Sequence, residues 1–147
     1  GRCHCTVDQV QRYRARISGP LLDRIDLHVE VPRVSHAVLH QSQPGGEETS
    51  ATVQQRVQNA RQLAYARTGK ANAQLTAPQI KRHCLLDEPS QKLLEQAMEK
   101  FGLSHRAYHR ILKVARTIAD LASSENIDAR HLSEAIGYRR LDRAQGR

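Results

Sequence analysis

Three cations recur at helical spacing in the second half of this 147-residue sequence: Arg106, Arg110 and Lys113. At about 100° per residue they share one face of the helix predicted over residues 104–123, opposite an apolar face. Like charges placed so close repel one another, so the pattern favours an anionic partner such as a phosphate. A solvated basic face without any partner is the alternative, and the spacing leaves both open.

Arg24 is a second candidate for phosphate chemistry, because a guanidinium is planar, permanently charged and suited to bidentate contacts. It lies between Asp23 and Asp26, just before a short alternating stretch. Taken alone, these flanking carboxylates favour an ordinary ion pair with Arg24. The neighbouring residues therefore permit a phosphate-binding role without requiring it.

Cys3-His4-Cys5 is a weak metal signal, because zinc takes four ligands that commonly come as two pairs. The sequence offers half of such a site in Cys3 and Cys5, with His4 as a bystander, and we expect it to be empty. His105 and His109 also have a spacing that can hold a metal. No carboxylate is in register with them, so we expect surface histidines.

Helical periodicity and capping residues predict the elements that must position these side chains. Helices are expected over residues 6–17, 52–67, 78–84, 88–101, 104–123 and 129–138, with one more turn over 21–25. The last four have capping residues and short connections, which is typical of a small helical bundle. In the longest helix, Asp120 falls on the polar face, which we expect to face solvent.

Two segments do not fit a bundle. Residues 27–31 alternate apolar and polar before Pro32, which predicts a short β-strand. A lone strand needs a sheet, and no other strand is predicted, so we interpret it as the trailing piece of an α/β core that lies outside this chain. Residues 36–50 are weakly patterned and contain Pro and Gly, which predicts a mobile linker.

The amino-acid composition further limits the class of protein. The net charge is +8 and aromatic residues make up 3%, which favours a small aliphatic helical core and raises the chance of a nucleic-acid or phosphate partner. The odd set Cys3, Cys5 and Cys84 argues for a reducing compartment, with Cys84 a core thiol. No stretch is long and apolar enough for a membrane helix, so a cytoplasmic protein is expected.

One absence in the sequence limits what the chain can do. It contains no Gly-x-x-x-x-Gly-Lys-(Ser/Thr) phosphate loop, and no apolar strand ending in Asp-Glu for magnesium. The chain therefore lacks the means to hold ATP, and we expect no hydrolysis by it alone.

Three stretches resemble one family: residues 12–31 (RYRARISGPLLDRIDLHVEV), 103–121 (LSHRAYHRILKVARTIADL) and 132–139 (LSEAIGYR). They are similar to the C-terminal part of magnesium-chelatase-like AAA+ ATPases of the bacterial competence type, the ComM/YifB family. The resemblance implies a mainly α chain with a four-helix lid bundle, preceded by a helical linker and a β-strand and helix remnant of the core. It divides the chain into a core remnant (1–35), a linker (36–75), a lid (76–142) and a tail (143–147).

The resemblance also assigns roles to residues. Arg24 matches the arginine finger, which acts on nucleotide bound by the neighbouring subunit. Arg106 matches the second sensor arginine at the start of the lid helix, where the helix dipole also favours an anion, and Arg110 could assist it. The family's further cysteines just upstream would complete a Zn²⁺ site with Cys3 and Cys5.

The implied parent is a hexameric ring motor that uses ATP and Mg²⁺ and migrates DNA branches, while this chain alone is inactive. A chelatase that inserts metal into a porphyrin is an alternative within the family. Outside it, the bundle could be a free-standing nucleic-acid-binding module, with a phosphate track formed by Arg106, Arg110, Lys113, Arg139 and Arg140. A purely structural clamp between subunits is a further alternative.

Overall fold

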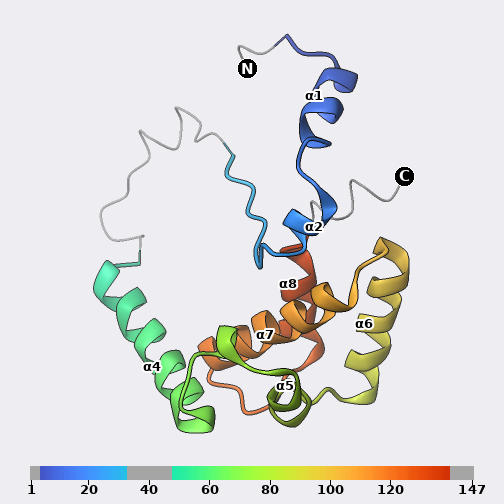
Figure 1. Ribbon diagram of the computed structural model, residues 1–147. Coiled ribbons are helices and arrows are strands. Elements are labelled where there is room, and N and C mark those ends of the chain that lie inside the picture. Colours follow the sequence, from blue (N-terminus) through green and yellow to red (C-terminus); the bar gives the residue numbers. More distant parts are fainter. Residues whose placement is uncertain (1–3, 33–47, 140–147) are drawn as a thin grey trace.

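The computed structural model describes residues 4–32 and 48–139, and these residues form helices joined by short connections (Figure 1). The elements are α1 (Val7–Arg14), α2 (Gly19–Leu22), α4 (Ser50–Thr68), the 3-10 turn η1 (Asn72–Gln74), α5 (Ala77–His83), α6 (Glu88–Phe101), α7 (His105–Leu121) and α8 (Ala129–Gly137). The mainly α fold class, with a helical lid-type bundle, is confirmed. No helix in the described ranges is both long and apolar enough to cross a membrane.

Helix α7 is the centre of the bundle, and α4, α5, α8 and η1 all pack against it. Its buried residues include Ala107, Ile111 and Ala115, which lie on the apolar face that the sequence predicts. Leu94 of α6 and Leu132 of α8 complete the core beside them. Burying this aliphatic face removes apolar area from water at roughly 25 cal/mol per Å², which is the main term holding the bundle together.

Local signals set the helix ends where the sequence places them. The Asp87, Ser104 and Asp128 side chains each accept a hydrogen bond from a backbone amide in the first turn of α6, α7 and α8. Gly69 and Gly102 end α4 and α6 in the left-handed conformation, with φ of 71° and 59°. These terminations need no long-range contact, which explains why they could be predicted.

The predicted strand over residues 27–31 is wrong. The part of the chain that the structure describes contains no strand, and its single β-bridge joins Leu86 to Ile127. Residues 27–31 are extended, but their backbone has no neighbouring strand to pair with. The His28 amide instead donates to the carbonyl of Tyr138, at 2.8 Å.

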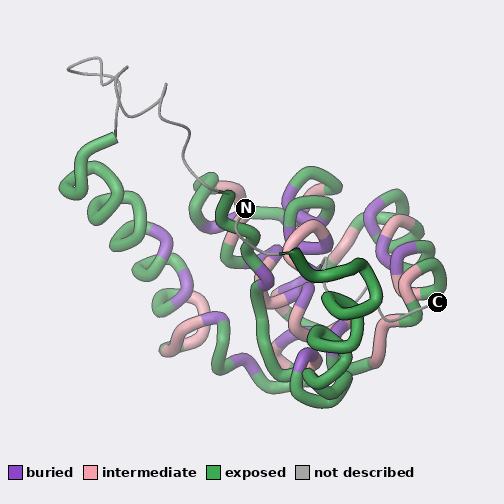
Figure 2. The backbone as a smooth tube through the Cα atoms, turned by 90° about the horizontal axis from the view of Figure 1, so that it is seen from above, coloured by how far each residue is buried: buried purple, intermediate pink, exposed green. Residues whose placement is uncertain are grey.

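Helix α4 corresponds to the helix expected in the linker, but in the structure it packs against α7. It begins at Ser50, behind a Thr49 cap, and its C-terminal half buries Ala60 and Ala64 while its N-terminal half stays exposed (Figure 2). Part of the polar face of α7 is covered by this packing. Asp120 is therefore 1% exposed, and the expectation that it faces solvent is wrong. Residues 33–47 and the tail 143–147 lie outside the described residues.

The helix predicted over 6–17 is shorter in the structure and ends at Arg14. A capping box between Thr6 and Gln9 starts it as expected. No residue of α1 is buried, as the exposed tube at this end shows (Figure 2). Because no tertiary packing stabilises this short helix, its last predicted turn does not form.

Candidate functional site

Residues 22–28 form a short segment that lies on the bundle where α7 begins and α8 ends. Leu22 anchors it and is 5% exposed. The Ser104 hydroxyl, at the N-cap of α7, donates to Asp23 at 2.9 Å, and Arg110 of α7 donates to Asp26. Arg139, just after α8, donates to the carbonyl of Ile25. Polar and apolar contacts therefore hold this segment on both sides of Arg24.

Arg24 itself is exposed. Within the described residues, no ion pair or hydrogen bond engages its guanidinium. The flanking carboxylates that could have neutralised it are bonded elsewhere, Asp23 to Ser104 and Asp26 to Arg110. A permanently charged fork left free in this way is available to a phosphate or a carboxylate from outside the chain.

Arg106 lies in the first turn of α7, two residues after the Ser104 cap, and is also exposed. Backbone amides in that turn and the positive end of the helix dipole favour an anion there. The hydrogen bond between Ser104 and Asp23 joins the start of α7 directly to the segment that carries Arg24. The structure thus brings the regions of both candidate arginines to one end of the bundle.

The other predicted cations are engaged. Arg110 is ion-paired with Asp26, and its side chain is 27% exposed. Lys113 donates to the carbonyl of Ala73 at 2.9 Å. Arg139 is 1% exposed, with Asp23 at 3.6 Å, so its burial differs from the surface position that a phosphate track requires. Arg140 lies outside the described residues.

Sequence reasoning missed a buried charge network between α4 and α7. Arg67 donates to Asp120, and Arg116, one turn earlier in α7, donates to the same carboxylate at 3.1 Å. The Asn72 amide adds a bond of 2.7 Å to Asp120. Burial lowers the pKa of Arg116, but the nearby Asp120 opposes that shift. The i, i+4 spacing of Arg116 and Asp120 was the one local signal that could have indicated it.

The cysteines and histidines give no metal cluster in the described ranges, where no group of three potential ligands comes together. Cys5 is exposed, and Cys3 is outside those ranges. Cys84 is buried, as predicted for a core thiol, and burial raises its pKa to about 11. His131 is 7% exposed and accepts a hydrogen bond from the Asp128 amide in the cap of α8, so it is a structural residue.

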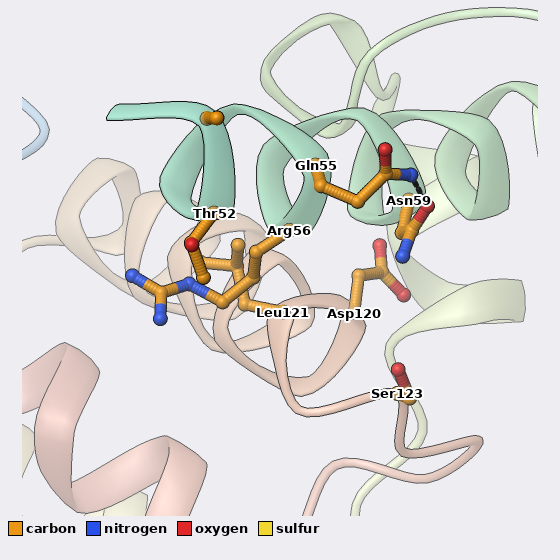
Figure 3. Close-up of a pocket in the computed structure, with 8 residues that line it drawn as sticks. Thr52, Gln55, Arg56, Asn59, Asp120, Leu121 and Ser123 are labelled. Carbon is orange, nitrogen blue, oxygen red and sulfur yellow. Dashed lines mark hydrogen bonds between the residues drawn. The ribbon is translucent and has the colours of Figure 1, made fainter. Parts of the chain in front are cut away.

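An open groove of about 540 Å³ lies between the N-terminal half of α4 and the end of α7 (Figure 3). Thr52, Gln55 and Arg56 line it from α4, with Leu121 and Ser123 opposite. Arg56 is already paired with Glu48 at 2.6 Å. Asp120 also lines the groove, but its carboxylate accepts from Arg67 and Arg116, so both charged groups of the groove are already paired.

Comparison with known proteins places the fold in a family. Residues 47–139 match the model of the magnesium chelatase subunit ChlI C-terminal domain, and residues 1–39 match that of the magnesium chelatase subunit ChlI. Because the first match covers more than half of the chain, the chain belongs to this family. The resemblance drawn from the sequence is confirmed.

Among individual proteins, the chain is 48% identical over 135 residues to the competence protein ComM of Haemophilus influenzae. It is 46% identical over 139 residues to YifB of Escherichia coli and 45% identical to YifB of Salmonella typhimurium. These alignments cover 92–95% of the chain but 26–27% of each relative. The chain therefore spans about a quarter of the length of the curated relatives that it matches.

Proposed function

We propose that this chain supplies the nucleotide-reading arginines of an ATP-driven AAA+ ring motor, with Arg24 as arginine finger and Arg106 as second sensor. The observation that carries the proposal is the exposed guanidinium of Arg24, which has no partner among residues 4–32 and 48–139 and lies beside two aspartates that bond elsewhere. Charge develops on the γ-phosphate during hydrolysis, and a free guanidinium stabilises it where an ion-paired one would not. Family membership supports the same role.

The residues present fit one half of an ATP site. Arg24 and Arg106 could contact phosphate oxygens, while the sequence has no loop to hold ATP and Mg²⁺. When bound, the nucleotide would supply the reacting phosphoryl group and Mg²⁺ would offset its negative charge. The chain's own contribution is to present positive charge at a boundary between subunits. In this proposal residues 1–35 belong with the motor core, 36–75 connect, and 76–142 form the lid.

We propose that the complete protein is a cytoplasmic homo-oligomer, a hexameric ring that moves DNA branches. The Haemophilus relative is named a competence protein, and this name supports a DNA substrate. The net charge of +8 fits DNA better than a porphyrin, although a chelatase role remains the alternative within the family.

The direct test is the ATPase activity of the full-length protein with Arg24→Ala, Arg24→Lys and Arg106→Ala, each with and without branched DNA. We expect Arg24→Ala to lower kcat by about 10³-fold, because loss of an arginine finger typically costs 10³–10⁵. Arg24→Lys should recover little, because an ammonium lacks the planar fork. The matched control is Arg130→Ala, since Arg130 is exposed and, in the part of the chain that the structure describes, its side chain bonds only to the nearby Asp128.

A subunit-mixing experiment tests whether Arg24 and Arg106 act on nucleotide bound by the neighbouring subunit. Subunits that lack Arg24 or Arg106 are combined with subunits that lack the phosphate-loop lysine. Recovery of activity at mixed interfaces is the expected result for residues that act across the subunit boundary. Full activity of Arg24→Ala would refute the finger, and absence of recovery would refute action on the neighbour.

A further inference from the structure

Most residues on either side of Arg24 in the segment 22–28 are held by contacts with the bundle. Leu22 and His28 are buried, Asp23 bonds to Ser104, Ile25 accepts from Arg139, and Asp26 pairs with Arg110. Within the described residues, the guanidinium of Arg24 has no hydrogen bond or ion pair, while the Arg24 backbone amide donates to the carbonyl of Leu21 at 3.0 Å. The arrangement immobilises the backbone on both sides of one exposed guanidinium.

The partners of this segment include the helix that carries the second candidate arginine. Ser104 caps α7, Arg106 lies in its first turn, and Arg110 lies one turn further on. A helix is stiff over one turn, so the start of α7 and the Arg24 segment can move only together while these bonds hold. Arg139, at 1% exposure, ties the end of α8 into the same unit.

Position matters more than proximity for groups that stabilise a transition state. A displacement of about 1 Å can cost 10²-fold in rate, and such groups need neighbours that lock their geometry. The guanidinium of Arg110 is engaged by Asp26, which lies 84 residues earlier in the sequence. That contact gives it a structural task that competes with any direct contact to nucleotide.

We propose that Arg110 and Asp26 are positioning residues: their ion pair, with Arg139 bound to the Ile25 carbonyl, fixes Arg24 to the lid helix that carries Arg106. Arg110 acts through Arg24 and does not contact the nucleotide. Movement of the lid is then transmitted directly to the finger. The catalytic part of this inference rests on the proposed role of Arg24, whereas the docking part does not.

Docking is tested on the 147-residue chain by hydrogen exchange of the His28 amide, which donates to Tyr138 at the edge of the unit. Arg110→Ala and Asp26→Ala should each raise its exchange rate about three- to tenfold, because both loosen the same segment. Asp26 is half exposed, so its replacement leaves the core intact. The matched control is Lys92→Ala, which removes an exposed ion pair on α6 with Glu88 and should leave His28 unchanged.

Positioning is tested in the full-length protein by ATPase kinetics of Arg110→Asp, Asp26→Arg and the combined swap. Each single variant should lower kcat about 10- to 100-fold with little change in KM for ATP, and the swap should restore most of the loss. A raised KM that the swap does not repair would mean that Arg110 contacts the nucleotide, and would overturn the proposal. So would unchanged exchange of His28, or faster exchange with unchanged kcat.

Failure of the proposed function and failure of the positioning role give different experimental results. If Arg24→Ala leaves the ATPase intact, the proposed function fails and the positioning role fails with it. The exchange of His28 in the Arg110 and Asp26 variants still reports whether the ion pair docks the segment. If Arg24→Ala is inactive but the Arg110 variants are not, the proposed function stands and the positioning role falls.

Discussion

At the scale of single residues, charged side chains in this protein fall into two groups with different tasks. Arg24 and Arg106 are exposed and available, whereas Asp120 and Arg116 are 1% and 2% exposed and bonded to each other. A buried carboxylate that accepts from two arginines is costly to remove, because the buried Arg116 and the partly buried Arg67 would lose their counter-charge. Near the start of α7 an arginine is thus exposed and proposed to contact phosphate, whereas near the end of the same helix charged side chains hold α4 and α7 together.

Asp120→Asn tests this view of the buried network. It should lower the free energy of unfolding by about 3–5 kcal/mol, because the buried Arg116 and the partly buried Arg67 lose their counter-charge. Urea denaturation monitored by helical circular dichroism measures it. Lys92→Gln, which breaks the exposed pair with Glu88, should change stability by less than about 1 kcal/mol. A loss below about 1 kcal/mol for Asp120→Asn would contradict a cohesive role.

At the scale of elements, α4 is held to α7 by its C-terminal half. Ala60 and Ala64 are small enough to allow close approach, and Arg67 reaches Asp120 from the last turn. Gly69 then ends the helix in the left-handed conformation and directs the chain into η1. The position of Asn72, which bonds to Asp120, depends on this turn.

Gly69→Ala should therefore destabilise the protein by about 1 kcal/mol, because an L-residue is strained at a φ of 71°. The cost is one of conformation alone, since nothing lies within 4 Å of an added Cβ there. Gly137 is the matched control: it lies within α8, has no positive φ and also has open space, so alanine should be neutral or stabilising. Equal effects at the two sites, measured by thermal unfolding, would count against the left-handed cap.

At the scale of the whole molecule, the question is whether the net charge of +8 makes a DNA-binding surface by itself. Of the proposed phosphate track, Arg110 and Lys113 are engaged and Arg139 is buried. Only Arg106 is free in the described part of that set. Such a distribution favours a lid that works within a ring over a free-standing nucleic-acid-binding module.

We expect the isolated chain to bind duplex DNA weakly, with a Kd above about 10 µM near 150 mM salt, because few cations of the proposed phosphate track are free to contact phosphates and release counterions. Fluorescence anisotropy across a salt series measures both affinity and slope. Arg110→Ala should leave both unchanged, since that guanidinium is paired with Asp26. Submicromolar binding at this salt would instead support the independent module.

The sequence by itself determined the helices, their caps and the arginines worth considering, because these depend on residues within a few positions of one another. The family followed from the same local stretches. Tertiary structure alone decided which charges are free. Arg67 meets Asp120 across 53 residues, Arg110 meets Asp26 across 84, and Arg139 meets Ile25 across 114. A side chain's partner and burial depend on which segments pack together, and no local pattern contains that information.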